Sequence, residues 1–255
     1  MKKIKVLNLY AGIGGNRKLW KNVDVTAVEI NPDIAKIYQD FFPEDKVIVA
    51  DAHQFLLEHF REFDFIWSSP PCPTHSRINT LLINGKGVKP RFPDMKLYEE
   101  IILLKHFFKG KWVVENVKSY YDPLIKPYID GRHYYWANFK IEDLTKDVIV
   151  RNNKGQTLKK KMQDRGIVIE NFYNYKGDKR TIINNCVSPQ AGLEIFNTAF
   201  RQQEQKLLSV SPTSQTSPNG DFSNEKEHNI SLKESANTDS QISSKDEASL
   251  NKNIK

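Results

Sequence analysis

Short apolar runs alternate with longer segments of helical spacing along the first 140 residues of the chain. The apolar runs predict strands, at residues 4–10, 25–30, 46–51, 63–69 and 111–117. Segments with helical spacing predict helices, at residues 31–42, 52–63 and 95–108. This alternation predicts an α/β fold in which helices cover both faces of a mostly parallel sheet.

The last part of the chain has a different composition. Residues 133–139 and 166–175 have the pattern of later strands, and residues 188–203 have the pattern of a closing helix. Beyond them the chain has no apolar period, and Phe222 is its one aromatic residue. Such a segment cannot offset its conformational entropy by burial, so we predict a disordered tail over residues 205–255.

The charge of the chain favours a polyanionic partner without proving one. The chain has 38 Lys and Arg against 31 Asp and Glu, a net charge of +7, and seven of these basic and eight of these acidic residues lie in 201–255. Residues 1–200 therefore carry +8, which suits nucleic acid but also occurs in proteins that bind none.

The cysteines and the apolar runs point to a compartment. Two cysteines, Cys72 and Cys186, provide neither a disulfide framework nor a metal cluster, so we predict no metal. No apolar run approaches the ~18 residues of a membrane span. We therefore expect a protein of the reducing cytoplasm with no membrane partner. We also expect a monomer.

Residues suited to chemistry follow each of the first five predicted strands. They are Gly12, Gly14 and Gly15 after the first strand, then Glu29, Asp51, Cys72 and Glu115 at the ends of the next four. In an open α/β sheet, ligands bind outside the carboxyl ends of the strands. The predicted topology therefore places these residues along one edge of the sheet.

The first of these groups predicts a cofactor site. The turn YAGIGGN at residues 10–16 allows close backbone approach to a ligand, but its spacing is not the G-x-G-x-x-G of dinucleotide sites. Glu29 follows at a distance suited to ribose hydroxyls, and Asp51 could accept a hydrogen bond from an adenine amine. Each feature alone is common in loops, but the ordered set favours a nucleoside cofactor without a pyrophosphate, such as S-adenosylmethionine.

The second group predicts a nucleophile and an acid. The stretch SSPPCPTHSR at residues 68–77 cannot be helical, because its prolines build a stiff loop around Cys72. Covalent catalysis by a cysteine usually needs a partner acid or base. Glu115, in the apolar run VVENV, should have a raised pKa and donate a proton. We interpret Cys186 as a small buried apolar residue.

These motifs carry a family resemblance. The segments NLYAGIGG, VEINP, SSPPCPTHS, VVENV, GRHYYWANF and NNCVSPQAG occur in the order of the cytosine-C5 DNA methyltransferase motifs. The chain resembles this family over roughly residues 4–200, and most resembles the short members carried by phages and bacteria. Methyltransferases that modify exocyclic nitrogens have an aromatic residue at the position of Cys72.

The resemblance implies a DNA (cytosine-5-)-methyltransferase on the Rossmann-like fold of S-adenosylmethionine-dependent enzymes. Its substrate would be a cytosine flipped out of double-stranded DNA. Cys72 would add to C6, Glu115 would protonate N3, and Arg132, with His133 as an alternative, would hold the cytosine O2. The cofactor-binding residues that the resemblance implies are Tyr10, Ala11, Gly12, Gly14, Gly15, Glu29, Ile30, Asp51, Ala52, Pro70 and Asn185.

The chain also departs from the family. Asn8 and Tyr10 replace an Asp and a Phe, and the region that would recognise the target is very short. We predict a cofactor-binding and catalytic domain at 1–140, a target-recognition region at 141–180, a C-terminal helix completing the catalytic domain at 181–204, and the tail. Basic residues that could contact phosphates are Lys86, Lys89, Arg91, Lys159, Lys160 and Lys161.

Two other functions stay open at this point. One is an RNA cytosine-C5 methyltransferase of the transfer-RNA type, and the other is a catalytically inactive DNA-binding relative. A pure binding protein would need neither Cys72 nor Glu115, which favours the enzyme. A role in restriction–modification, in phage protection or in regulation is compatible with the sequence.

Overall fold

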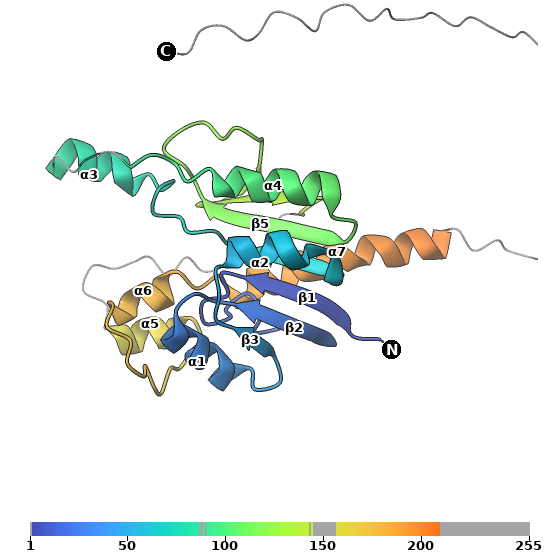
Figure 1. Ribbon diagram of the computed structural model, residues 1–255, viewed down its shortest axis with the longest axis horizontal. Coiled ribbons are helices and arrows are strands. Elements are labelled where there is room, and N and C mark those ends of the chain that lie inside the picture. The colour runs from blue at the N-terminus through green and yellow to red at the C-terminus, as the bar shows by residue number, and fades with distance from the viewer. Residues whose placement is uncertain (1, 87–88, 90, 143, 145–156, 210–255) are drawn as a thin grey trace, which may run out of the picture. The chain divides into compact units, whose positions relative to one another are not determined.

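The computed structural model describes residues 2–86, 89, 91–142, 144 and 157–209. A seven-stranded sheet runs through this part of the chain, with strand order β3-β2-β1-β4-β5-β7-β6 (Figure 1). The strands are β1 (Ile4–Leu9), β2 (Val23–Val28), β3 (Lys46–Ile48), β4 (Phe65–Ser68), β5 (Lys111–Val117), β6 (Tyr128–Asp130) and β7 (His133–Ala137).

Five of the strands are parallel, and the last two form a reversed hairpin. Each neighbouring pair among β1 to β5 is parallel, whereas β7 runs antiparallel to β5 and to β6. The carboxyl ends of β1 to β5 therefore share one edge of the sheet. Because Val117 at the end of β5 pairs with His133, the start of β7 lies at that edge as well.

Helices cover both faces of this sheet. They are α1 (Pro32–Phe41), α2 (Ala52–His59), the 3₁₀ helix η1 (Phe60–Glu62), α3 (Ile78–Lys86), α4 (Lys96–Phe107), α5 (Leu158–Asp164), α6 (Lys179–Asn184) and α7 (Pro189–Ser209). Proline at the first position of α1, with the Asn31 side chain capping it, explains why that helix begins at Pro32.

The alternation of side chains along each strand divides the core into two layers. On one face, Leu7, Ile66 and Val114 pack against Leu56 of α2 and against Leu97, Ile101 and Leu104 of α4. On the other face, Val6, Phe65, Trp67 and Val113 pack against Trp20 and against Ile195 and Phe196 of α7. Figure 1 shows α4 lying along β5 and α1 beside β3. The predicted α/β class is confirmed, with a mostly parallel sheet covered on both faces.

Several predicted elements need correction. Residues 166–175 form no strand, because the buried Ile167 and Ile169 pack with α1, α5 and α6 instead of pairing in the sheet. Residues 78–86, where no helix was predicted, form α3. The closing helix α7 extends to Ser209, so residues 205–209 of the predicted tail are helical. The rest of the tail, and residues 145–156 of the predicted recognition region, lie outside the described residues.

Two further observations concern partners. Among the residues that the structure describes, no helix is long and apolar enough to cross a membrane. The same residues contain no group of three or more His, Cys, Asp or Glu placed to hold a metal ion.

Candidate active site

The glycine turn after β1 is held in place by backbone hydrogen bonds. The amide of Ala11 donates to the carbonyl of Val28 at 3.0 Å, and the amide of Gly14 donates to the carbonyl of Ala11 at 2.9 Å. Gly12 has φ +53°, and a Cβ on it would meet no heavy atom within 4 Å. The turn therefore combines left-handed backbone with open space beside it, which suits close approach of a ligand.

The other two glycines of the turn have packing roles. A Cβ on Gly14, whose φ is +76°, would collide with the ring of Phe42. A Cβ on Gly15 would collide with Sγ of Cys186 and with the carbonyl oxygen of Val187. The segment that follows α6 thus packs directly on the glycine turn. Asn185, predicted on the cofactor side, lies in this segment as the exposed C-cap residue of α6.

Glu29 reaches the turn from the end of β2. Its carboxylate accepts hydrogen bonds from the amide of Gly12 at 3.0 Å and from the amide of Asn31 at 2.9 Å. Burial raises the pKa of this carboxyl, and the backbone donors oppose that rise. The next residue, Ile30, leaves 66% of its side chain exposed although it is apolar. A carboxylate beside an exposed apolar side chain offers both polar and apolar contacts to a nucleoside.

Asp51 lies elsewhere than the strand pattern predicts. Strand β3 ends at Ile48, and Asp51 is the N-cap of α2, where its carboxylate accepts a hydrogen bond from the amide of Gln54 at 2.9 Å. That bond lowers the pKa of Asp51, and the charge of Lys96 adds to the effect. Asp51 is exposed and Ala52 is buried, so Asp51 is the one of the two that can reach a ligand.

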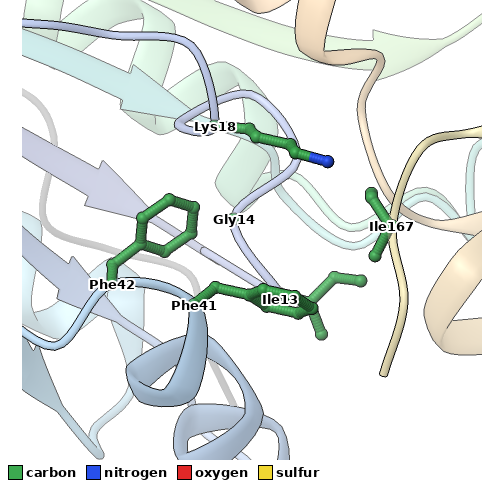
Figure 2. A pocket seen from close by; sticks show the side chains of 6 residues that line it. All are labelled: Ile13, Gly14, Lys18, Phe41, Phe42 and Ile167. Atoms are coloured by element: carbon green, nitrogen blue, oxygen red, sulfur yellow. The ribbon is translucent and has the colours of Figure 1, made fainter. Parts of the chain in front are cut away.

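A small apolar cavity lies on one side of the glycine turn. It has a volume of about 230 Å³ and is lined by Ile13, Gly14, Lys18, Phe41, Phe42 and Ile167 (Figure 2). The ammonium group of Lys18 donates to the carbonyl oxygen of Gly166, which joins the turn to the segment after α5. Of the predicted site residues, Gly14 alone lines this cavity.

The loop that carries Cys72 is fixed at both sides of the thiol. The carbonyl of Cys72 accepts hydrogen bonds from the amides of His75 and Ser76, each at 3.0 Å, which forms a tight turn. Before the thiol, the carbonyl of Pro70 accepts a hydrogen bond at 3.0 Å from the buried Asn116 side chain of β5. Proline stiffness and these bonds together give the half-buried Cys72 a defined position.

Glu115 lies beside this thiol. It is 8% exposed, and Nε2 of His133 lies 4.0 Å from its Oε1. Burial raises the pKa of Glu115, while His133 and a hydrogen bond with Ser69 lower it. Burial and the nearby charge of Glu115 both raise the pKa of the Cys72 thiol. A protonated Glu115 can donate a proton, and in that form it no longer opposes thiolate formation at Cys72.

The two candidates from GRHYYW separate in the structure. His133 begins β7 and lies near Glu115, as the antiparallel pairing with β5 requires. Arg132 is exposed in the turn before it, and its carbonyl accepts a hydrogen bond from the amide of Lys118 at 2.9 Å. The arrangement brings His133 to Glu115, whereas the role of Arg132 stays a prediction.

The end of the loop that carries Cys72, residues 68–77 and here called the catalytic loop, is tied to the segment after β5. Ser76 and Ser119 form an antiparallel bridge, and Nε of Arg77 donates to the carbonyl of Ser119 at 3.3 Å. His75 is buried, and its Nδ1 forms a hydrogen bond of 2.6 Å with the Tyr121 hydroxyl. Asn116 and His75 were not predicted as site residues, although they lie within the motifs VVENV and SSPPCPTHS.

Comparison with known families finds a match in the first half of the chain. Residues 4–123 match the sequence profile of the family described as C-5 cytosine-specific DNA methylase. The segments VEINP, SSPPCPTHS and VVENV fall inside this match, so the resemblance stated from them is confirmed there. The family implies S-adenosylmethionine as the cofactor, as predicted.

Three individual relatives each match this chain over part of their own length. The chain is 29% identical over 131 residues to the tRNA (cytosine(38)-C(5))-methyltransferase of Spodoptera frugiperda, covering 48% of this chain and 38% of that protein. The crystal structure of a mutant of Spodoptera frugiperda DNMT2 is 31% identical, covers 46% and 36% of the two chains and gives a TM-score of 0.32. The methyltransferase EhMeth of Entamoeba histolytica is 20% identical, covers 46% and 39%, and gives a TM-score of 0.30. The chain thus spans less than half the length of these proteins.

Proposed function

Because residues 4–123 match the C-5 cytosine-specific DNA methylase family, we propose that the chain transfers a methyl group from S-adenosylmethionine to C5 of cytosine in DNA. One observation carries the proposal: the loop holding Cys72 is fixed against β5, beside the buried acid Glu115. A thiol and a protonated carboxyl facing one substrate are the two groups that covalent activation of a pyrimidine ring requires.

Cys72 is the nucleophile in this proposal. Its thiolate forms a bond to C6 while the electrons of the C5–C6 double bond move through the ring towards N3. The ring then becomes nucleophilic at C5, which an intact cytosine is not. Burial and the charge of Glu115 both raise the pKa of the thiol, so the thiolate forms more readily when Glu115 is protonated, and the thiol proton passes to a water molecule.

Glu115 is the acid. It donates a proton to N3 as negative charge develops there, and burial raises its pKa, so it holds that proton to a higher pH than an exposed glutamate does. His133, whose Nε2 lies 4.0 Å from Oε1 of Glu115, is the candidate for contact with the cytosine edge. In the last step a water molecule accepts the C5 proton, the electrons of that C–H bond restore the C5–C6 double bond, and the C6–S bond breaks to release the Cys72 thiolate. Glu115 recovers its proton from N3.

The residues at the glycine turn fit the cofactor. The space beside Gly12 is open, the Glu29 carboxylate faces the turn, and Ile30 and Asp51 are exposed next to it. Glu29 would hold the ribose hydroxyls, Asp51 the adenine amine, and Ile30 the face of the base. The cofactor, when bound, supplies an electrophilic methyl group.

The surface beside the catalytic loop suits a nucleic acid. Lys86, Lys89 and Arg91 are exposed, and the next residue, Phe92, leaves 87% of its ring exposed. The amide of Asp94 donates to the Thr74 hydroxyl at 3.2 Å, which ties this segment to the loop of Cys72. Exposed cations bind phosphates, and an exposed ring can stack on a base. Lys159 and Lys160, on α5, are also exposed.

A second candidate has its own support. The curated relative acts, by its name, on cytosine 38 of a transfer RNA, so an RNA substrate for this chain is the alternative. The catalytic pair would act identically on either nucleic acid, because the reacting base is flipped out of its stack in both. Direct competition between unmethylated duplex DNA and transfer RNA in one reaction separates the two substrates.

The test is transfer of a labelled methyl group to duplex DNA, with the product base identified by mass. We expect 5-methylcytosine from the wild type and none from Cys72→Ser, with Cys186→Ser as the matched control. Cys186 is packed against Gly15 and its pKa is raised to about 11, so it should be dispensable for the chemistry. Methylation by Cys72→Ser at the wild-type rate would overturn the assignment of the nucleophile.

A further inference from the structure

A carboxylate outside the catalytic pair is buried beneath the site. The side chain of Glu100, on α4, is 0% exposed. Its Oε1 accepts a hydrogen bond from the Tyr10 hydroxyl at 2.6 Å and lies 3.1 Å from Nδ1 of His53, and its Oε2 accepts from the Ser68 hydroxyl at 2.6 Å. A carboxylate is costly to bury, so a network that satisfies both oxygens has to be in place when the chain folds.

The three partners of Glu100 come from three segments that carry proposed site residues. Tyr10 begins the glycine turn, two residues before Gly12, in a left-handed conformation with φ 54°. His53 lies in the first turn of α2, two residues after Asp51. Ser68 ends β4, four residues before Cys72. One side chain therefore joins both parts of the cofactor site to the strand that leads into the catalytic loop.

We propose that Glu100 is a positioning residue, which holds the cofactor-binding turn and the catalytic loop in fixed relation to each other. The inference rests on the proposed methyltransferase function, because that function makes the turn and the loop parts of one site. Tyr10 contributes to this network through its hydroxyl group. A Phe there could not reach Glu100 with a hydrogen bond.

His53 makes this network sensitive to pH. Its Nδ1 faces Glu100, and its Nε2 lies 3.2 Å from Glu99, so both contacts are hydrogen bonds only when the imidazole is doubly protonated. The hydrogen bond with Glu100 raises the pKa of His53, and the charges of Glu100 and Glu99 add to it, while burial and Lys96 lower it. Asp51 is the other charged group that interacts with His53, and the pKa of Tyr10 is raised, so its hydroxyl stays protonated.

Loss of the second imidazole proton should loosen the cofactor turn. As the pH rises through the pKa of His53, one carboxylate contact of the ring is lost, and cofactor affinity should fall with it. Glu100→Gln keeps the size of the side chain but removes the charge that favours protonated His53. We therefore expect this variant to bind cofactor about tenfold more weakly, as for the loss of a hydrogen bond to a charged group, and with little dependence on pH.

The experiment uses the full chain and isothermal titration with S-adenosylhomocysteine across a range of pH. Glu44→Gln, an exposed carboxylate in the turn between α1 and β3, is the matched control and should behave as the wild type. Tyr10→Phe and Ser68→Ala each remove one donor to Glu100, and we expect each to weaken binding a few-fold. If Glu100→Gln does not fold, these two variants test the positioning role in its place.

A second readout needs no cofactor. The ring protons of His53, followed by NMR against pH, should titrate at a raised pKa in the wild type and at a lower one in Glu100→Gln. An unchanged titration, or equal cofactor affinity with the same pH profile, would overturn the positioning role. A wild type that binds no S-adenosylhomocysteine would instead overturn the proposed function and the positioning role with it.

Discussion

Replacing Glu115 by Gln would remove a buried acid while keeping the shape of its side chain. Glu115 is 8% exposed in the middle of the sheet edge, and burial raises its pKa against the opposing effects of His133 and Ser69. The carboxyl thus keeps its proton to a higher pH than an exposed glutamate does, whereas a Gln has no proton to give. General acids contribute about 100- to 10,000-fold to rate, so we expect kcat of Glu115→Gln to fall by that factor.

The same burial couples the free energy of unfolding to pH. The folded protein binds the Glu115 proton more tightly than the unfolded chain, whose carboxyl has the ordinary pKa of 4.5. This stabilisation is fully present below the unfolded value and is lost as the pH rises through the folded-state pKa. Each unit by which folding raises the pKa corresponds to about 1.4 kcal/mol. Glu115→Gln has no such titration, so its stability relative to the wild type should increase as the pH rises.

Urea denaturation at several pH values, combined with methyl-transfer kinetics, measures both effects on the same two proteins. Glu44→Gln again serves as the control, because an exposed carboxylate should change neither quantity. In the wild type, kcat should also decline as the pH rises through the pKa of Glu115. The reasoning would be refuted by a Glu115→Gln variant that keeps wild-type kcat, or by a stability difference that does not depend on pH.

Three further predictions concern the turn, the loop and the basic surface. Gly15→Ala should lower the free energy of unfolding by about 1–3 kcal/mol in urea, because the added methyl group meets Cys186 and Val187; an unchanged midpoint would contradict this packing. Asn116→Ala should cost about 1–3 kcal/mol and lower kcat more than it raises KM, because it leaves the Pro70 carbonyl unpaired beside Cys72; a purely KM effect would argue against a role in loop position. The double variant Lys89→Ala, Arg91→Ala should reduce the salt dependence of DNA binding by about two counterions if both residues contact phosphates, and an unchanged slope would exclude those contacts.

The sequence by itself determined the parallel core of the sheet and most of the chemistry placed on it. Apolar runs such as 4–10 and 111–117 show burial on both faces, and only strands covered by helices on both sides have that pattern. Parallel strands then share one edge, so Glu29, Cys72 and Glu115 were predicted near one another from their places after strands. Chain direction and strand order are enough to predict that these residues lie near one another, without any knowledge of side-chain contacts.

Periodicity failed where burial has another cause. The alternation of Ile167 and Ile169 resembles a strand, but these side chains are buried against helices and pair with no strand. A pattern records which side chains avoid water and not what covers them. Tertiary contacts also decided two other features that the pattern did not predict. One is the helix α3, and the other is the position of Asp51 as a helix cap instead of a strand end.

Only the tertiary structure revealed the residues that hold the site together. Glu100 meets Tyr10 across 90 positions of the chain, and Asn116 meets Pro70 across 46. His133 reaches Glu115 because an antiparallel hairpin brings β7 back to the edge where β5 ends. The sequence determines which reacting groups are present. The packing of distant segments determines which side chains contact and position them, and only the tertiary structure shows that packing.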